Sequence, residues 1–414
     1  MKHLIPYLLI PVLFLLSGCE KKLSGESYDP EGSTDTRSKS ISYQVRKTWR
    51  MDNGKVNFSN EFTGARLNDV VQHSDSVFEI VINPENEPVN KSPWYGFMVW
   101  SDEPREIAVH LSYFGEYGHR YYPDISKDLE IWQPMDSARV LTDTTAHRTT
   151  MILNTGPDTL YIAAQEIMTS GYVYNKLDTL ADEPYVSRAT IGYSTLGKPI
   201  PLLKMGNQDS REVIVILGRQ HPPEATGFIA LQAFTGRIAA PDDSLSQAFR
   251  KKFLILLIPM INPDGVDQGH WRHSAAGIDL NRDWQYFNQP ETDAVRSYVE
   301  SFMSDDDREI LFEIDFHSTQ EDLFYVFEPD QPSNLTGFTH DWLDAIEEDL
   351  VYYKADRVPT SGDSPVSTHW FYTRYNTEAV TYEVGDDSPR ERIREISTTA
   401  AEKMMELMLQ SDKD

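Results

Sequence analysis

The stretch that most constrains this chain runs from Glu212 to Gly227 and reads EVIVILGRQHPPEATG. Its first half, Val213 to Leu217, is a short apolar run rich in β-branched residues, which predicts a strand buried on both faces of an α/β sheet. His221 and Glu224 follow this run across a Pro-Pro turn, and an amphipathic helix begins after them. Ligands in open α/β sheets gather where the strands end at their carboxyl side. A His and a carboxylate three residues apart at that place are suited to hold one side of a zinc ion.

A third ligand is offered by His317, which ends a second apolar strand expected over residues 309–316. A single His at a strand end is more often structural than functional, and in a carboxylate-rich chain a Glu three residues after a His is expected by chance. The combination of His221, Glu224 and His317 is more specific, because two His and one Glu form a zinc set that leaves one position open to water. The three residues therefore predict a metal site at the carboxyl edge of the sheet.

The N-terminus has the pattern of a targeting segment. Lys2 precedes an apolar run from Leu4 to Leu16, which is too short to span a bilayer as a stable helix. The run ends in Leu-Ser-Gly-Cys19, which resembles the lipobox of bacterial lipoproteins. We expect residues 1–19 to be a lipoprotein signal peptide, with a lipid on Cys19 as membrane anchor, and residues 20–40 to be a flexible tether. This predicts a lipid-anchored protein of the bacterial cell envelope, periplasmic or on the cell surface; an ordinary secretory signal is the alternative.

Composition limits the partners of the chain. The formal net charge is −27, which argues against a nucleic-acid partner because phosphate contacts need clustered Lys and Arg. The 414 residues are 40% hydrophobic and include one cysteine. The chain is therefore long enough for two packed units, and disulfides within one chain are excluded.

Two fold regions are expected after the tether. Residues 41–170 carry short aromatic and β-branched runs separated by turn residues, which predicts a small β-sandwich. Trp94, Trp100 and Trp132 fit the core of such a sandwich, with binding of a carbohydrate or a partner as the alternative. Residues 171–414 alternate between strand and helix patterns, which predicts an α/β unit with a mixed, mostly buried sheet and helices on both faces. Strands are expected at 188–194, 199–203, 213–217, 253–258, 309–316, 323–327 and 379–384, and helices at about 291–303, 339–350 and 390–409.

Long motifs lie between the expected metal ligands. Residues 261–266 read INPDGV, and residues 269–284 read GHWRHSAAGIDLNRDW. This pattern resembles the zinc metallocarboxypeptidases and looks most similar to their cytosolic-carboxypeptidase subgroup. The resemblance covers most of residues 90–410, and that subgroup also places a β-sandwich before the catalytic domain. It implies a catalytic domain over residues 171–414 that binds one Zn²⁺.

The resemblance also implies a role for each matching residue. A metal ion held by the three ligands would acidify its bound water and polarise the scissile carbonyl. The implied roles are zinc binding by His221, Glu224 and His317, orientation of His221 by Asp279, oxyanion stabilisation by Arg272, clamping of the substrate's terminal carboxylate by Asn281 and Arg282, and general-base catalysis on the zinc-bound water by Glu383.

The match to the family is incomplete at two places. The family's tyrosine on a mobile loop upstream of the catalytic Glu has no counterpart in the local stretch VPTSGD at residues 358–363. The loop over residues 360–368 is also lengthened, so the side-chain pocket is open to alternatives. Arg374 or Lys354 would favour an acidic terminal residue, whereas Asp363 would favour a basic one.

These observations predict a zinc metallocarboxypeptidase that hydrolyses the C-terminal peptide bond of peptides outside the cytoplasm, with a substrate that carries a free C-terminal carboxylate. Two alternatives use the same fold. One is a zinc amidohydrolase acting on cell-wall peptides or N-acyl amino acids, and the other is an inactive lipoprotein that binds peptides or glycans. Loss of Glu224, His317, Arg272 or Glu383 would favour the inactive protein, and all four are present.

Overall fold

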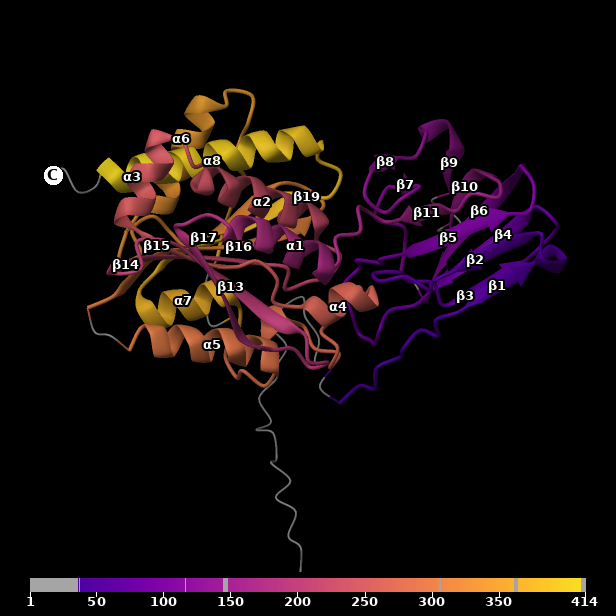
Figure 1. Ribbon diagram of the computed structural model, residues 1–414, viewed down its shortest axis with the longest axis horizontal. Coiled ribbons are helices and arrows are strands. Elements are labelled where there is room, and N and C mark those ends of the chain that lie inside the picture. Colours follow the sequence, from indigo (N-terminus) through magenta and orange to yellow (C-terminus); the bar gives the residue numbers. More distant parts are fainter. Residues whose placement is uncertain are drawn as a thin grey trace, which may run out of the picture.

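The structure, a computed structural model, describes residue 36 and residues 38–115, 117–143, 148–304, 307–360 and 364–410. The predicted signal peptide, its Cys19 and most of the predicted tether lie outside the described residues. Figure 1 shows two units side by side, a β-sandwich built from residues 48–163 and an α/β unit built from residues 170–410. No helix within the described ranges combines the length and the apolar character needed to cross a membrane.

The sandwich consists of two sheets with strand orders β1-β2-β5-β11-β7-β8 and β3-β4-β6-β10-β9. Burial alternates along β4 and β6, so that Phe78, Ile80 and Val109 point into a common core while their neighbours face outward. The strands are β1 (Thr48–Met51), β2 (Val56–Ser59), β3 (Asp69–Gln72), β4 (Val77–Ile82), β5 (Gly96–Ser101), β6 (Arg105–Tyr113), β7 (Asp124–Ser126), β8 (Trp132–Pro134), β9 (Val140–Asp143), β10 (Arg148–Thr155) and β11 (Leu160–Ala163).

The α/β unit contains one mixed sheet with the order β12-β13-β15-β14-β16-β19-β17-β18. Strands β15, β14, β16 and β19 run parallel in the middle of the sheet. The pairs β12–β13, β13–β15 and β17–β19 are antiparallel, and the edge strand β18 pairs parallel with β17. The strands are β12 (Val186–Tyr193), β13 (Pro199–Gly206), β14 (Glu212–Gly218), β15 (Leu254–Ile258), β16 (Glu309–Thr319), β17 (Leu323–Val326), β18 (Arg357–Pro359) and β19 (Glu378–Gly385).

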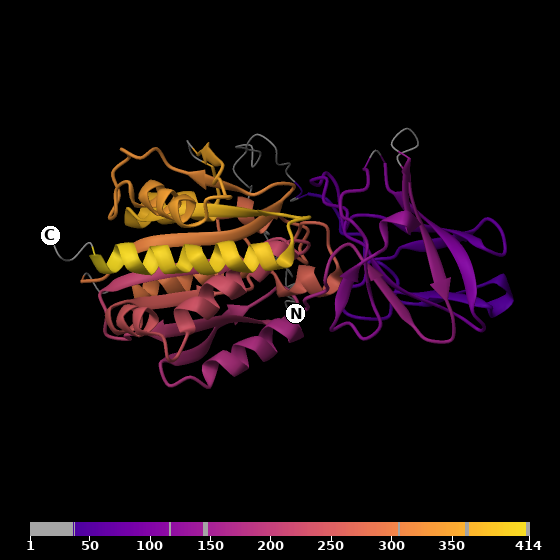
Figure 2. The same ribbon diagram turned by 90° about the horizontal axis from the view of Figure 1, so that it is seen from above.

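Helices cover both faces of this sheet, which confirms the predicted fold class. Helices α1, α2, α3, α6 and α8 pack on one face and α5 and α7 on the other, because the central strands present apolar side chains in both directions. Figure 2 shows α8 lying along the sheet, with its first turn near the sandwich and its end remote from it. The helices are α1 (Ser170–Ala181), α2 (Ala225–Ala239), α3 (Ser244–Lys252), α4 (Pro263–Gln268), α5 (Pro290–Phe302), α6 (Phe338–Asp349), α7 (Ser367–Tyr375) and α8 (Arg390–Gln410).

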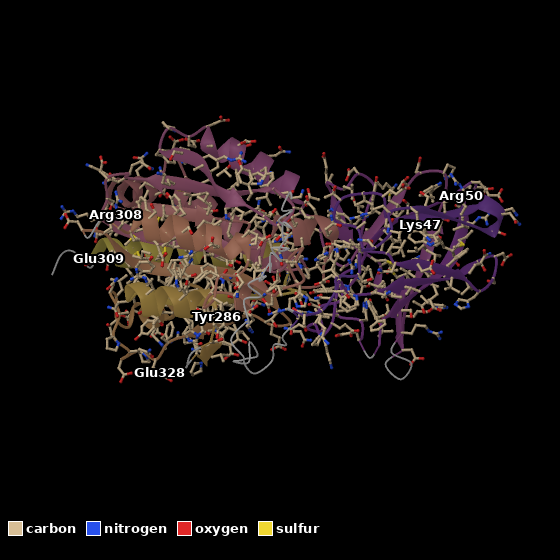
Figure 3. All side chains as sticks on the ribbon, turned by 90° about the horizontal axis from the view of Figure 1, so that it is seen from below. Lys47, Arg50, Tyr286, Arg308, Glu309 and Glu328 are labelled. Carbon is tan, nitrogen blue, oxygen red and sulfur yellow. The ribbon has the colours of Figure 1, made fainter. Side chains whose placement is uncertain are left out.

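The connections create a switch point at β14. The chain passes from β14 to its neighbour β15 and then returns across β14 to β16 on the other side. Connections that leave a strand in opposite directions open a crevice at its carboxyl end. Figure 3 labels Arg308 and Glu309 at the end of the α/β unit remote from the sandwich, so β16 starts there and runs toward the sandwich. The crevice therefore faces the sandwich.

The two units share a packed boundary. The indole of Trp271, which belongs to the α/β part of the chain, is 0% exposed and lies in the hydrophobic core of the sandwich. Its ring meets Tyr117 edge-on, at 5.1 Å between ring centroids. Gly269 has a φ of 65° and approaches the sandwich so closely that a Cβ there would lie 2.5 Å from the carbonyl oxygen of Ala65. A further contact between the units joins Arg120 of the sandwich to Asp386, at 2.8 Å between Nε and Oδ2.

The expected strands and helices of the α/β unit are present, and most ends lie within three residues of their predicted positions. Helices α1, α3, α4 and α7 were not expected from the sequence. The last of these begins at Ser367, inside the stretch expected to be a lengthened loop, of which residues 361–363 lie outside the described part. The predicted division of the chain at residue 170 stays a prediction; in the structure α1 begins there.

Candidate metal and catalytic site

His221 and Glu224 are positioned by the turn that follows β14. Arg219 adopts a left-handed conformation with a φ of 54°, which turns the chain away from the sheet directly after the strand. Glu224 then lies at the N-cap of α2. Gly227, in the first turn of α2, lets the helix pack flush on β16, because a Cβ at this position would lie 2.4 Å from the carbonyl oxygen of His317. Because residue 227 has no side chain, α2 packs close enough to β16 for Glu224 to reach His317.

The structure places the three predicted metal ligands together in a buried cluster, with all candidate ligand atoms within 4.8 Å of one another. The Nδ1 atom of His221 is 2.7 Å from Oε1 of Glu224, and the Nδ1 atom of His317 is 2.8 Å from Oε2 of the same carboxylate. The two Nδ1 atoms are 3.2 Å apart. Donor atoms about 2.0–2.1 Å from one tetrahedral ion lie roughly 3.3 Å from each other, so the distance between the two Nδ1 atoms suits a single zinc ion, while the Glu224 carboxylate lies at hydrogen-bond distance from both imidazoles.

The outer nitrogen of each imidazole faces a second carboxylate. His221 Nε2 is 2.9 Å from Oδ1 of Asp279, and His317 Nε2 is 2.9 Å from Oδ2 of Asp315. An imidazole that donates its Nε2 hydrogen to a carboxylate keeps the lone pair on Nδ1. Both lone pairs then point at one centre together with the Glu224 carboxylate, and protons on Nδ1 or a metal cation between the groups would relieve the repulsion.

The electrostatics of the pocket also call for a cation. Burial disfavours the charged form of His317, but the carboxylates of Asp315 and Glu224 outweigh it and raise the pKa of His317 well above its usual value. Burial acts in the opposite sense on Glu224, yet His221 and His317 hold the pKa of its carboxyl well below its usual range. The donor set, its spacing and its negative charge fit zinc.

Asp315 was not singled out by the sequence analysis, although it lies two residues before His317 on the same face of β16. Its Oδ2 atom also accepts hydrogen bonds from Nε2 of Gln220 and Oγ of Ser367, each at 2.5 Å. Gln220 in turn accepts a hydrogen bond from the indole of Trp284, at 2.8 Å. These bonds fix the carboxylate that orients His317. The signal was available, because side chains at i and i+2 of a strand share a face.

Arg272 lies beside the cluster and is tied to it through Asp279. Its Nε atom donates to Oδ2 of Asp279 at 2.6 Å, while the other oxygen of that carboxylate faces His221. Burial opposes the charged form of Arg272, but Asp279, Glu224 and Glu383 raise the pKa of the guanidinium. Arg272 is therefore a cation fixed by Asp279 within electrostatic reach of both Glu224 and Glu383.

Asn281 and Arg282 occupy different positions relative to the cluster. The side chain of Asn281 is buried, with Oδ1 accepting from the backbone N–H of Ser367 at 3.0 Å and Nδ2 lying 3.3 Å from Nε2 of His317. Arg282 is half-buried and donates through Nη1 to the carbonyl oxygen of Asn281 at 2.8 Å. The amide of Asn281 therefore has to leave its present partners before it can bind a substrate, whereas part of Arg282 is open to solvent.

Glu383 stands next to His317 across the parallel pair β16–β19, where the two residues are partners in register. The side chain is half-buried, and its Oε2 atom has no hydrogen-bond partner among the described residues. Burial and the nearby Glu224 carboxylate raise the pKa of Glu383 to about 7, against the opposing charges of His317, His221 and Arg272. A carboxylate held near neutrality beside a metal cluster is suited to accept a proton.

Tyr325, on β17, is a further residue that the sequence analysis missed. It pairs with Thr381 of β19, so its side chain shares a face with Glu383, two residues along that strand. Its ring is 38% exposed, and burial together with the charge of Glu383 raises the pKa of its hydroxyl, while Arg282 and His317 act in the opposite sense. A phenol hydroxyl is thus present within electrostatic reach of the candidate base and Arg282.

The two cations weighed for the side-chain pocket are engaged at the surface. The side chain of Lys354 is 81% exposed and pairs with Glu347, and that of Arg374 is 57% exposed and lies 3.9 Å from Glu300. Asp363 lies outside the described residues. Neither described cation contacts the metal cluster, so neither identifies the terminal residue of a substrate.

Comparison with known proteins agrees with a zinc site at this cluster. A family model described as zinc carboxypeptidase matches residues 173–405, which is more than half of the chain. Cytosolic carboxypeptidase-like protein 5 of Mus musculus is 36% identical over 92 residues, or 22% of this chain and 10% of that protein. Cytosolic carboxypeptidase 6 of Mus musculus is 23% identical over 325 residues, or 70% of this chain and 59% of that protein. The chain thus spans about a tenth of the first of these relatives.

The fold of the whole described chain has a match among solved structures. A metallo-carboxypeptidase from Burkholderia cenocepacia aligns with a TM-score of 0.70 at 17% identity and covers 87% of this chain and 99% of its own. At this identity the match shows a shared fold, with the sandwich included in the aligned part. Together with the family match over residues 173–405, it shows that the chain belongs to the zinc carboxypeptidase family.

Proposed function

We propose that this protein is a zinc carboxypeptidase that hydrolyses the C-terminal peptide bond of peptides outside the cytoplasm. The observation that carries the proposal is the register pair His317–Glu383, which sets a carboxylate with a buried oxygen that has no partner among the described residues beside a His₂Glu cluster. His221, Glu224 and His317 would hold zinc, which when bound supplies a Lewis acid for the scissile carbonyl and for the attacking water.

Each of the neighbouring residues then has a separate role in the hydrolysis. Glu383 takes a proton from the water as its oxygen bonds to the carbonyl carbon, and it returns a proton to the nitrogen as the C–N bond breaks. Arg272 donates to the oxygen on which negative charge develops, where a fixed cation in a buried site is most effective. Asp279 and Asp315 keep the two imidazoles in the orientation and tautomer that metal binding needs.

Recognition of the substrate's end falls to Arg282 and Asn281. A guanidinium makes a two-pronged contact with a carboxylate that an ammonium group cannot copy. Arg282 follows the buried Asn281 directly, so it is anchored within the same short loop as Asp279. This arrangement suits a peptide with a free C-terminal carboxylate.

The proposal is tested with peptides that differ only in the last residue, each made as the acid and as the C-terminal amide, with added zinc or with a chelator. We expect cleavage of the acids, poor cleavage of the amides and no cleavage with chelator. Arg282→Lys should weaken the preference for the acid, and Arg308→Lys, at the remote end of the unit, is the matched control. Equal cleavage of acid and amide would favour the amidohydrolase alternative, and binding without any cleavage would favour the inactive protein.

The location is a separate part of the proposal. The apolar run before Leu-Ser-Gly-Cys19 and the polar stretch after it support a lipid anchor on Cys19. Cys19→Ser should move the protein from the membrane fraction to the soluble fraction of cells. A variant that stays in the membrane pellet would count against lipid on Cys19 as the anchor.

A further inference from the structure

The loop that carries Arg272 is held from outside the α/β unit. Trp271 enters the sandwich core, as described above, while the guanidinium of the next residue, Arg272, reaches Asp279 at the metal cluster. The backbone of this loop therefore lies on the boundary of the two units, and its position depends on what the sandwich offers it.

The sandwich offers a carboxylate. Glu85 lies a few residues beyond the end of β4, is 0% exposed, and accepts hydrogen bonds from three consecutive backbone N–H groups. Its Oε2 accepts from Trp271 at 2.8 Å, and its Oε1 accepts from Arg272 at 3.1 Å and from His273 at 2.8 Å. One side chain thus satisfies the whole turn that presents Arg272.

The neighbours of Glu85 strengthen this contact. Asn86 faces Nδ1 of His273 at 2.6 Å and donates to the carbonyl oxygen of Gly277 at 2.9 Å. Ser92 donates to the carbonyl oxygen of Trp271 at 2.8 Å. Three side chains of the sandwich therefore hold both the N–H and the C=O groups of this one loop.

The charge of Glu85 matters as well as its shape. Burial alone would raise its pKa, but His270, His273 and Arg66, with the backbone N–H of His273, lower the pKa to about 2. The group is ionised at neutral pH. An ionised carboxylate can accept all three bonds, whereas a neutral amide would turn an NH₂ group toward N–H donors.

We propose that Glu85 of the sandwich is a positioning residue for hydrolysis, which holds the backbone of residues 271–273 so that the guanidinium of Arg272 faces the reacting carbonyl. The inference rests on the proposed function, because it gives Arg272 the oxyanion to stabilise. It makes the sandwich a part of the active site. Asp279 fixes the Nε atom of Arg272 from one side and Glu85 fixes its backbone from the other.

The experiment compares Glu85→Gln with Glu79→Gln in the full chain. Glu79 is a half-buried carboxylate of the same unit, on β4, bound to His73 at 2.8 Å, so its variant removes an equal charge away from the loop. Because a misplaced oxyanion donor costs transition-state stabilisation, we expect Glu85→Gln to lower kcat by about 10- to 100-fold with KM close to that of the wild type. Zinc content should be unchanged, and Glu79→Gln should behave as the wild type.

A double variant separates positioning from a general loss of structure. If Glu85 acts through Arg272, then Glu85→Gln should have no further effect on kcat in an Arg272→Ala background. The same loss in both backgrounds, or a normal kcat in Glu85→Gln, would overturn the proposal. If Glu85→Gln does not fold, Glu85→Asp, which keeps the charge on a shorter side chain, takes its place in the comparison with Glu79→Gln and in the Arg272→Ala background.

Hydrogen exchange gives a readout that does not need activity. The amides of Trp271, Arg272 and His273 should exchange faster in Glu85→Gln than in the wild type and in Glu79→Gln. Unchanged exchange would show that Glu85 does not hold the loop, which also overturns the proposal. Faster exchange in a protein that cleaves no peptide would leave the hold of Glu85 on the loop intact and refute the proposed function instead.

Discussion

The two units contribute to one site in opposite ways. The α/β unit brings its residues to the crevice on the carboxyl ends of parallel strands, so that β14, β16 and β19 deliver the metal ligands and Glu383 directly. None of the described residues of the sandwich belongs to the metal cluster; the sandwich contributes Glu85, which accepts hydrogen bonds from the backbone of the loop that carries Arg272. The comparison teaches that the groups that react and the groups that hold them in place can come from separately packed cores.

The largest effect is expected at the base. Glu383→Gln keeps the size of the side chain but cannot accept the proton, so turnover should fall by about 10²- to 10⁴-fold with zinc content unchanged. The measurement is kcat on the best-cleaved peptide, with Glu309→Gln as control, because Glu309 is exposed at the remote start of β16. Near-normal turnover would mean that the α/β unit holds its base elsewhere.

The second prediction breaks the boundary between the units. Trp271→Ala removes an indole that the α/β part of the chain places in the sandwich core. Replacing a buried Trp by Ala costs about 3–5 kcal/mol, and we expect a loss of this size in the free energy of unfolding measured with urea. Tyr193→Ala is the control, because that side chain is 63% exposed. A loss below about 1 kcal/mol would show that the two cores do not depend on Trp271.

A third prediction concerns the support of the metal within the α/β unit. Asp315→Asn removes the charge that orients His317, and such a change beside a metal ligand weakens metal binding by about 10- to 100-fold. Competition with a chelator of known affinity measures this effect. Asp330→Asn, at an exposed position, should bind zinc as the wild type does. If Asp315→Asn binds zinc equally well, the hydrogen bond to Nε2 of His317 is dispensable.

The smallest effect is expected at Tyr325. Tyr325→Phe removes one hydroxyl from the face that Glu383 occupies, and a single hydrogen bond contributes about 0.5–1.5 kcal/mol. We therefore expect a few-fold fall in kcat/KM on the peptide acids and no change in zinc binding. Tyr352→Phe, whose hydroxyl binds Glu395 at the surface, is the control. Equal activity of Tyr325→Phe and wild type would show that the hydroxyl does not touch the substrate.

The central sheet could be predicted because its two middle strands β14 and β15 are almost entirely apolar. Residues such as those of β14 and β15 leave no doubt about burial on both faces, and a His after such a strand is visible from the sequence alone. The helices that were not expected from the sequence have less distinctive residue patterns. The segment STHWFYTRY of α7 has aromatic residues typical of a strand, and SLSQAFRKK of α3 is largely polar. Their helical form depends on packing against the rest of the unit.

The candidate site could be predicted where its residues follow local rules. His221, Glu224, His317 and Glu383 each lie on or just after a recognisable strand, whereas Glu85 lies 186 residues before Trp271 in a loop with no pattern of its own. A contact of that kind depends on how two cores dock, which neither periodicity nor spacing records. Asp315 is an intermediate case. Its spacing of two residues from His317 places both side chains on one face of the strand, but a single carboxylate within an apolar run does not by itself indicate a site.

The burial of Trp271 has a consequence for the order in which the parts of the site form. The sandwich leaves the ribosome first, and domains generally fold in that order. Until the later part of the chain arrives, the sandwich lacks one large side chain from its own core, and Glu85 has no N–H groups to bind. Docking completes that core and sets the Arg272 loop in the same event. Under the proposed function, the Arg272 loop therefore reaches its working position only when the α/β part of the chain docks on the sandwich.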